Sequence, residues 1–161
     1  MRLVKHLPRP GVGETLTPTT LDAQPWVLLV KPPQPMPTPA VFGAYKASAA
    51  PFTAHLADIR REAWCLSEIS ALHNDLAVPA CQLNPDLGRQ LALLAQTPEV
   101  QLSRLSGSGP TSFALYPDAL SAQAAKSAFS PPFRMSGQRY AAYSNGWPVI
   151  YRFLDGARMR D

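Results

Sequence analysis

Three short segments of the chain have the apolar pattern of β-strands. "WVLLV" at Trp26–Val30 is a continuous run rich in strand-forming residues, bracketed by prolines on both sides. "VQLSRL" at Val100–Leu105 alternates apolar and polar residues, and "SFALY" at Ser112–Tyr116 is a second apolar run close behind it. Continuous apolar runs of this length are typical of buried strands, and alternation is typical of half-buried ones. The sequence therefore predicts one early strand and a later strand pair.

Helical spacing dominates the middle of the chain. From Thr53 to about Cys81, apolar residues recur every three or four positions, which predicts a helix there; these residues are Leu66, Ile69, Leu72 and Leu76. Asn84 and Pro85 form a cap and first turn for a further helix, whose apolar stripe is Leu87, Leu91 and Leu94. The alanine-rich "DALSAQAAKSAF" predicts another helix, capped near Asp118.

The first third of the chain is rich in proline, with ten of the 18 prolines in residues 1–51. We expect extended segments and turns there, apart from a short helix from Pro39 to about Lys46 with Thr38 as its cap. "WPVIYRFL" in the tail is a possible last strand. This order of elements predicts an α+β fold, with helices on one face of a mainly antiparallel sheet.

Composition adds a class of protein to this pattern. With 161 residues, 46% of them hydrophobic and 16% charged, the chain has the make-up of one globular domain. Its net charge of +4 is concentrated at the two ends, without a basic and aromatic face, so we expect no nucleic-acid partner. No apolar run approaches the roughly 20 residues of a membrane helix, and the two cysteines, Cys65 and Cys81, fit a cytoplasmic compartment.

The stretch "RLSGSGPTSFALYPD" (Arg104–Asp118) contains the candidate chemistry of the chain. Gly107 and Gly109 are followed neither by the lysine of a Walker A loop nor by the third glycine and helix of a dinucleotide fingerprint. Pro110 also removes one amide that could bind an anion. From these residues alone, a hairpin turn is favoured over a phosphate-binding loop.

Several motifs in order change this interpretation. "GVGETLTP" (11–18), "WVLLVKPPQPMPTPAVF" (26–42), "HNDL" (73–76) and "LSGSGPTSFALY" (105–116) resemble the 4-diphosphocytidyl-2-C-methyl-D-erythritol kinases of the GHMP superfamily. These enzymes act in isoprenoid biosynthesis by the non-mevalonate pathway. The resemblance covers about Gly11 to Phe129 and implies the ferredoxin-like C-terminal domain of a GHMP kinase.

The resemblance also implies roles for particular residues. Thr38 and Phe42 match positions that line the substrate site, where the aromatic ring stacks on cytosine; from the residues alone, Phe42 would be expected to pack its helix against the core. Asn74 and Asp75 would lie on a helix facing the Gly-Ser loop and support it, the alternative being plain helix-surface polarity. The loop would lie beside the nucleotide phosphates and support the catalytic cleft, through Ser106, Gly107, Ser108, Gly109 and Thr111.

The catalytic groups of the family have no match in this chain. Members carry an ATP-binding glycine-rich loop, a lysine and an aspartate before the "GVGE" segment, whereas only ten residues precede Gly11 here. We therefore expect no catalytic residue and no metal ligand in the chain. ATP and Mg²⁺ would be bound in a complete enzyme, whose N-terminal kinase half would be a partner of this domain.

The sequence thus predicts three regions and two functions. Residues 1–24 would be an extended remnant of the N-terminal domain, 25–129 the GHMP kinase C-terminal domain, and 130–161 a divergent tail with a closing strand. The first function is the substrate side of a kinase that phosphorylates cytidylylated methylerythritol, inactive alone. The alternative is a non-catalytic fragment that folds alone or binds a ligand or partner, and a nucleic-acid adaptor is a third, weaker possibility.

Overall fold

The computed structural model describes residues 2–6, 16–32, 34–51, 53, 63–129, 134–135, 138–139 and 149–152. Its helices are α1 (Thr38–Ala47), α2 (Leu66–Ala71), α3 (Ala77–Leu83), α4 (Pro85–Ala95) and α5 (Ala119–Ala128). Its strands are β1 (Arg2–His6), β2 (Leu16–Leu21), β3 (Trp26–Val30), β4 (Ala63–Trp64), β5 (Leu102–Leu105), β6 (Ser112–Tyr116), β7 (Arg134–Met135), β8 (Gln138–Arg139) and β9 (Val149–Arg152).

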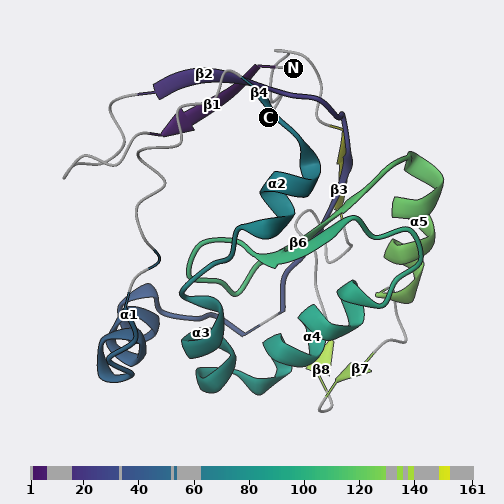
Figure 1. Ribbon diagram of the computed structural model, residues 1–161. Helices are drawn as coiled ribbons and strands as arrows, with labels where there is room; N and C mark the ends of the chain where they lie inside the picture. Colours follow the sequence, from purple (N-terminus) through teal and green to yellow (C-terminus); the bar gives the residue numbers. More distant parts are fainter. Residues whose placement is uncertain are drawn as a thin grey trace.

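A four-stranded antiparallel sheet is the centre of the fold (Figure 1). Its strand order is β5-β6-β3-β9, so the three predicted strands lie side by side, and a strand of the tail completes the sheet. Val27 of β3 lies opposite Leu115 of β6, which in turn lies opposite Leu102 of β5. The predicted α+β fold with a mainly antiparallel sheet is confirmed.

Helices α4 and α5 pack on one face of this sheet. Side chains alternate between the two faces of a strand, so Leu28 and Val30 of β3 point to the same side as Ala114 and Tyr116 of β6. These four buried side chains form one core cluster with Leu94 of α4 and with Ala122, Ala125 and Phe129 of α5.

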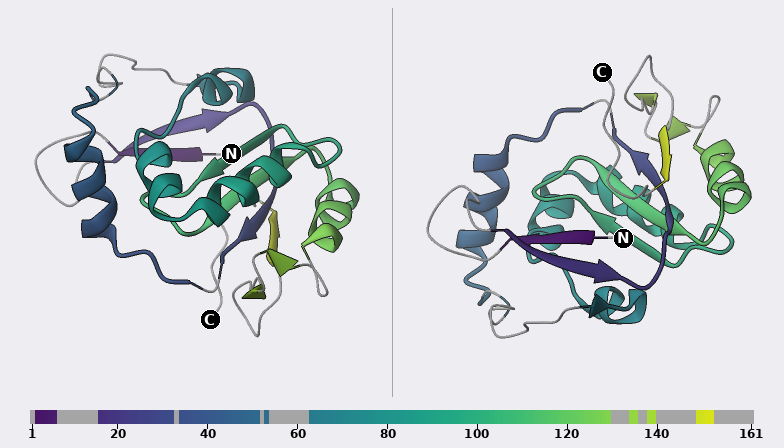
Figure 2. Two further views of the ribbon diagram at one scale, coloured as in Figure 1. Left: turned by 90° about the horizontal axis from the view of Figure 1, so that it is seen from below. Right: turned by 90° about the horizontal axis from the view of Figure 1, so that it is seen from above.

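A second core cluster positions the Gly-Ser loop. It joins Val41 of α1, Ala80 of α3, Leu87 of α4 and Leu105, the last residue of β5. Helices α1, α3 and α4 therefore follow one another along one side of the sheet (Figure 1), and α4 contacts β5. Figure 2 shows α1 and α5 at opposite ends of the molecule, with the sheet between them.

Two of the predicted helix starts are confirmed by their caps. The Asn84 side chain accepts a hydrogen bond from the Asp86 amide at 3.2 Å, with Pro85 as the first helical residue of α4. The Asp118 carboxylate accepts from the Ser121 amide at 2.8 Å at the start of α5. These side chains satisfy amides that have no partner within their helix.

The single helix expected from Thr53 to Cys81 is wrong. Residues 63–64 form β4, α2 ends at Ala71, and a turn separates it from α3. The physical reason lies in Asn74, whose side-chain oxygen accepts from the Leu76 amide at 3.0 Å while its carbonyl accepts from the Ala77 amide. Such local bonds offer the backbone an alternative to the helix, although the apolar spacing continues through them.

The start of α1 also differs by one residue from the expectation. Pro37 is the cap, Thr38 is the first helical residue, and the Thr38 hydroxyl makes no capping bond. Pro39 lies in the first turn instead, and its ring fixes the φ angle close to the value that a helix requires. The hydroxyl of Thr38 is thereby left to bind elsewhere.

The first and last parts of the chain contribute further strands. β1, β2 and β4 form a three-stranded sheet, in which β1 and β2 are antiparallel and β2 and β4 parallel. β7 pairs with β8 in a small ribbon. Among the helices that the structure describes, none has the length and hydropathy to cross a membrane.

Candidate functional site

The Gly-Ser loop is a tight connection between β5 and β6. The Ser106 amide donates to the Thr111 carbonyl at 2.9 Å, and the Gly109 amide donates to the Ser106 carbonyl at 3.0 Å. Gly107 and Gly109 have φ angles of +56° and +86°, which side chains rarely adopt. The hairpin turn favoured by the residues alone is therefore the backbone conformation of the loop.

Space as well as backbone angle calls for glycine at position 109. A Cβ atom there would lie 3.0 Å from Cδ1 of Leu105, 3.5 Å from Sδ of Met36 and 3.6 Å from Cδ2 of Leu87. The loop is thus packed directly on the second core cluster and on the segment that leads into α1.

The loop also contacts the first residue of α1. The hydroxyls of Thr38 and Ser108 lie 2.8 Å apart and share a hydrogen bond, although 70 residues separate them in sequence. Thr38 is exposed and Ser108 is partly exposed. The resemblance assigns Thr38 to the substrate site and the loop to the phosphate side, and these two segments meet at one surface.

Phe42 lies one helical turn beyond Thr38 on α1, and 47% of its surface is exposed. The helix is packed against its neighbours by Val41 and Tyr45, which are both buried. Phe42 is therefore not covered by the core, and its spacing of four residues from Thr38 places both residues on the same side of α1.

Asn74 connects the turn between α2 and α3 with the loop. Its side-chain amide donates to the carbonyls of Leu105 at 3.1 Å and Gly107 at 2.7 Å. The expected position of Asn74 and Asp75 on a helix is wrong, because both lie in the turn. Asn74 nevertheless faces the Gly-Ser loop, whereas Asp75 binds a different part of the chain.

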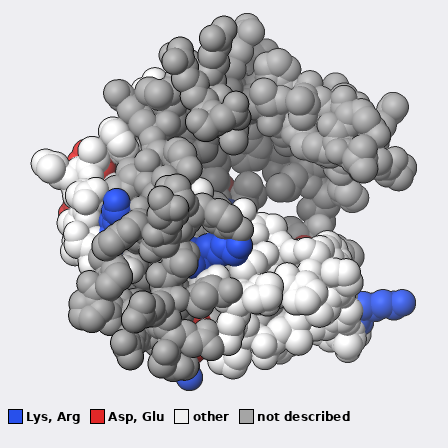
Figure 3. All heavy atoms as spheres, turned by 180° about the vertical axis from the view of Figure 1, so that it is seen from behind, with Lys and Arg blue, Asp and Glu red and all other residues white. Residues whose placement is uncertain are grey.

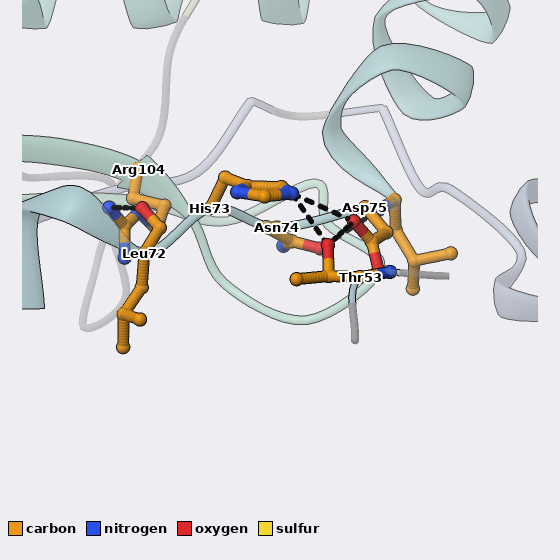
Figure 4. Close-up of polar contacts among 7 residues, drawn as sticks. Thr53, Leu72, His73, Asn74, Asp75 and Arg104 are labelled. Carbon is orange, nitrogen blue, oxygen red and sulfur yellow. Dashed lines mark hydrogen bonds and ion pairs between the residues drawn. The ribbon is translucent and has the colours of Figure 1, made fainter. Parts of the chain in front are cut away.

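Asp75, His73 and Thr53 form a small polar cluster (Figure 4). The Thr53 hydroxyl donates to Oδ1 of Asp75 at 2.5 Å and lies 2.6 Å from Nε2 of His73, while the Thr53 amide donates to Oδ2 of Asp75 at 2.9 Å. The two hydrogen bonds from Thr53 have the largest effect on the pKa of Asp75 and lower it. Burial opposes them, and the charge and hydrogen bond of His73 lower the pKa by smaller amounts. The sequence does not predict Thr53, because its partners lie some 20 residues away.

Two cavities flank these contacts. One, of about 540 Å³, is lined by Tyr45, the turn residues 72–75, the start of α3 and Arg104. The other, of about 690 Å³, lies between the segment before α1 and the start of α4, and includes Met36, Pro37, Ala40, Leu83 and Arg89. Helix α1 contributes Ala40 to one cavity and Tyr45 to the other, and the Thr38–Ser108 bond joins this helix to the loop.

The ionisable side chains at these contacts are His73 and Asp75, and Arg104 lines the same cavity. On the face shown in Figure 3, the Lys and Arg side chains of the described residues are scattered over the surface. Within the described part of the chain, no three His, Cys, Asp or Glu side chains come together as a metal site would require. The chemistry that these residues offer is hydrogen bonding by hydroxyls, together with aromatic stacking.

Comparison with curated proteins relates the chain to one kinase family. A 4-diphosphocytidyl-2-C-methyl-D-erythritol kinase of Paramagnetospirillum magneticum is 42% identical over 118 residues, which are 71% of this chain and 40% of the relative. Kinases of the same name from Rhodospirillum rubrum and Caulobacter sp. are 39% and 40% identical, over 70% and 65% of this chain and 37% and 38% of the relatives. The chain thus spans about two fifths of the length of these relatives.

Comparison with solved structures agrees on the fold. A crystal structure of 4-(cytidine 5'-diphospho)-2C-methyl-D-erythritol kinase superposes with a TM-score of 0.56 at 22% identity, covering 87% of this chain and 47% of that one. No protein-family model matches the chain. The resemblance inferred from the motifs is confirmed: the chain is similar to kinases of this name.

Gly109→Ala is expected to destabilise the protein by about 1–3 kcal/mol, because the new Cβ meets Leu105 and the backbone keeps a positive φ. Gly43→Ala is the matched control, since it lies in α1 with no atom within 4 Å of the new Cβ, and a helical alanine is favoured over glycine. Urea denaturation gives the free energy of unfolding of each variant, which is compared with that of the unchanged protein. Equal stability of Gly109→Ala and the unchanged protein would contradict the packing described for the loop.

Thr53→Val is expected to raise the pKa of Asp75, because it removes the hydroxyl bond that lowers this pKa most. A carboxyl with a lowered folded pKa stabilises the fold above its unfolded pKa, near 3.9, and loses this contribution as the pH falls through the folded value. The variant should therefore lose less stability than the unchanged protein on acidification below about pH 4.

Titration of the carboxyl carbons by NMR measures this shift. Asp118 is the internal control, since its pKa is lowered mainly by the Ser121 amide, which the substitution leaves in place. If Asp75 titrates at the same pH in both proteins, the hydroxyl of Thr53 does not lower the pKa of Asp75.

Proposed function

We propose that this chain, which is related in sequence to the 4-diphosphocytidyl-2-C-methyl-D-erythritol kinases, forms the substrate side of such a kinase. In this proposal it is the C-terminal domain, and it binds the cytidine diphosphate part of the substrate between α1 and the Gly-Ser loop. The observation that carries the proposal is the bond between Thr38 and Ser108, which joins two family motifs at one exposed surface.

Phe42 would stack on the cytosine ring. Its exposed fraction of 47% and its place one turn from Thr38 support this role, since a ring that only packed a helix would be covered. Stacking of a base on an aromatic ring contributes about 1–3 kcal/mol and needs no charged partner. The Thr38 hydroxyl would then lie at the other end of the same helical turn, toward the loop.

The hydroxyls of Ser106, Ser108 and Thr111 would line the phosphate side. Hydroxyl donors to charged phosphate oxygens form stronger bonds than neutral pairs do. Gly107 and Gly109 would let the phosphates approach the backbone closely, because they carry no side chain. Asn74 would take no direct part, but its two bonds to the loop carbonyls would hold these hydroxyls in place.

Phosphoryl transfer itself would need groups beyond the described residues. We assign no ATP ligand, Mg²⁺ ligand or catalytic base to them, and such transfer depends on charge stabilisation around the γ-phosphate. The match covers 40% of the first relative, so about three fifths of that protein lies outside the matched region. We place the ATP-binding and catalytic groups in that part. The 161 residues alone would then bind substrate without phosphorylating it.

Calorimetry with CDP tests the proposed site. We expect CDP to bind the chain, and Phe42→Ala to weaken binding roughly 5- to 150-fold, which corresponds to the loss of about 1–3 kcal/mol of stacking. Leu120→Ala is the control, because Leu120 is an exposed apolar residue of α5, at the end of the molecule opposite α1 (Figure 2).

Two results would contradict the proposal. Unchanged CDP affinity in Phe42→Ala would exclude the stacking role, and no CDP binding at millimolar concentration would favour the non-catalytic alternative. Incubation with ATP and the cytidylylated substrate tests the remaining part, since turnover at an ordinary kinase rate would show that the chain alone is active.

A further inference from the structure

Arg104 lies at the entrance to the Gly-Ser loop, and none of the roles above uses it. It precedes Leu105 in β5, and neighbouring side chains of a strand point to opposite faces. Leu105 enters the second core cluster. Arg104 therefore points to the other side, where its guanidinium is close to the end of α2 (Figure 4).

The guanidinium binds three main-chain carbonyls at this helix end. Nη1 donates to the Ile69 carbonyl at 3.3 Å, and Nη2 donates to the carbonyls of Ser70, at 3.4 Å, and Leu72. The last carbonyls of a helix lack amide partners within the helix, and a cation at that end is favoured by the helix dipole. The Ile69 carbonyl also accepts from the Leu72 amide at 3.1 Å. Partial burial lowers the pKa of Arg104 below its ordinary value, yet an arginine remains charged at neutral pH.

Asn74 makes the reverse connection. It lies two residues after Leu72, and its side-chain amide donates to the carbonyls of Leu105 and Gly107. Each of the two segments thus sends one polar side chain to the backbone of the other. Arg104 anchors the turn from the loop side, and Asn74 anchors the loop from the turn side.

We propose that Arg104 is a positioning residue for the Gly-Ser loop, acting as one half of a reciprocal brace with Asn74. Its guanidinium fixes residues 69–72, which sets the place of Asn74, and Asn74 in turn fixes the carbonyls at the start of the loop. The loop then presents Ser108 to Thr38. The effect of this brace on CDP binding rests on the proposed function, whereas its effect on the loop does not.

Amide hydrogen exchange of the full chain tests the brace directly. Arg104→Met keeps an apolar side chain and removes all donors, so we expect the Ser106 and Gly109 amides to exchange at least about tenfold faster. The amide of Leu28, in the central strand β3, should be unchanged. Arg89→Met is the control, because Arg89 is an exposed arginine of α4 that pairs with Asp86.

The pattern of exchange separates positioning from general stability. Equal acceleration of exchange at Ser106, Gly109 and Leu28 would mean that Arg104 only stabilises the whole fold. No acceleration at Ser106 and Gly109 would mean that Arg104 does not position the loop. Either result overturns the proposal. If Arg104→Met does not fold, Arg104→Lys, which keeps the charge but lacks the planar fork, is compared by the same criterion.

A double-mutant cycle tests whether Arg104 and Asn74 act together. Asn74→Ala alone should also accelerate the loop amides, and the double variant should accelerate them by clearly less than the product of the two single factors. Factors that simply multiply would show two independent contacts and contradict the brace. Arg104→Met should also weaken CDP binding, whereas Leu120→Ala, the distant control used above, should not. Absence of CDP binding by the unchanged chain would refute the proposed function and leave the exchange result standing.

Discussion

The side chain of Asn74 is the interaction that joins the turn after α2 to the start of the Gly-Ser loop. Leu105 is buried, and a buried carbonyl is costly to leave unpaired, whereas Gly107 is exposed. One amide group of Asn74 reaches the carbonyls of both Leu105 and Gly107. The same residue interrupts the helical pattern through its local bonds with the Leu76 and Ala77 amides, so Asn74 both shapes the turn and binds the loop.

Local signals in the sequence predicted much of the fold. The strands Trp26–Val30 and Ser112–Tyr116 follow from apolar runs, and the caps Asn84 and Asp118 act on amides two and three residues away. Such features depend on neighbours in sequence, so they can be read without knowing the rest of the chain. The motif resemblance then supplied the kinase relationship, which periodicity and composition could not.

The features that the sequence did not predict depend on distant partners. The spacing of Leu66, Ile69 and Leu72 continues as in a helix, but α2 ends at Ala71, and Asn74 and Asp75 in the turn bind other segments. Thr38 has the sequence signature of a helix cap, yet its hydroxyl binds Ser108, 70 residues away. Arg104 binds only main-chain carbonyls, and these carry no residue-specific signal.

The proposed substrate side of a kinase combines these elements: an exposed ring on α1, hydroxyls on a fixed loop, and a helix and loop that meet at Thr38 and Ser108. Titration of the isotope-labelled chain with CDP, followed by amide NMR shifts, tests this claim most directly. The account predicts that the largest shift changes fall at Phe42 and at residues 106–109. Largest changes instead around His73, Asp75 and Gln82, beside the 540 Å³ cavity, would contradict it.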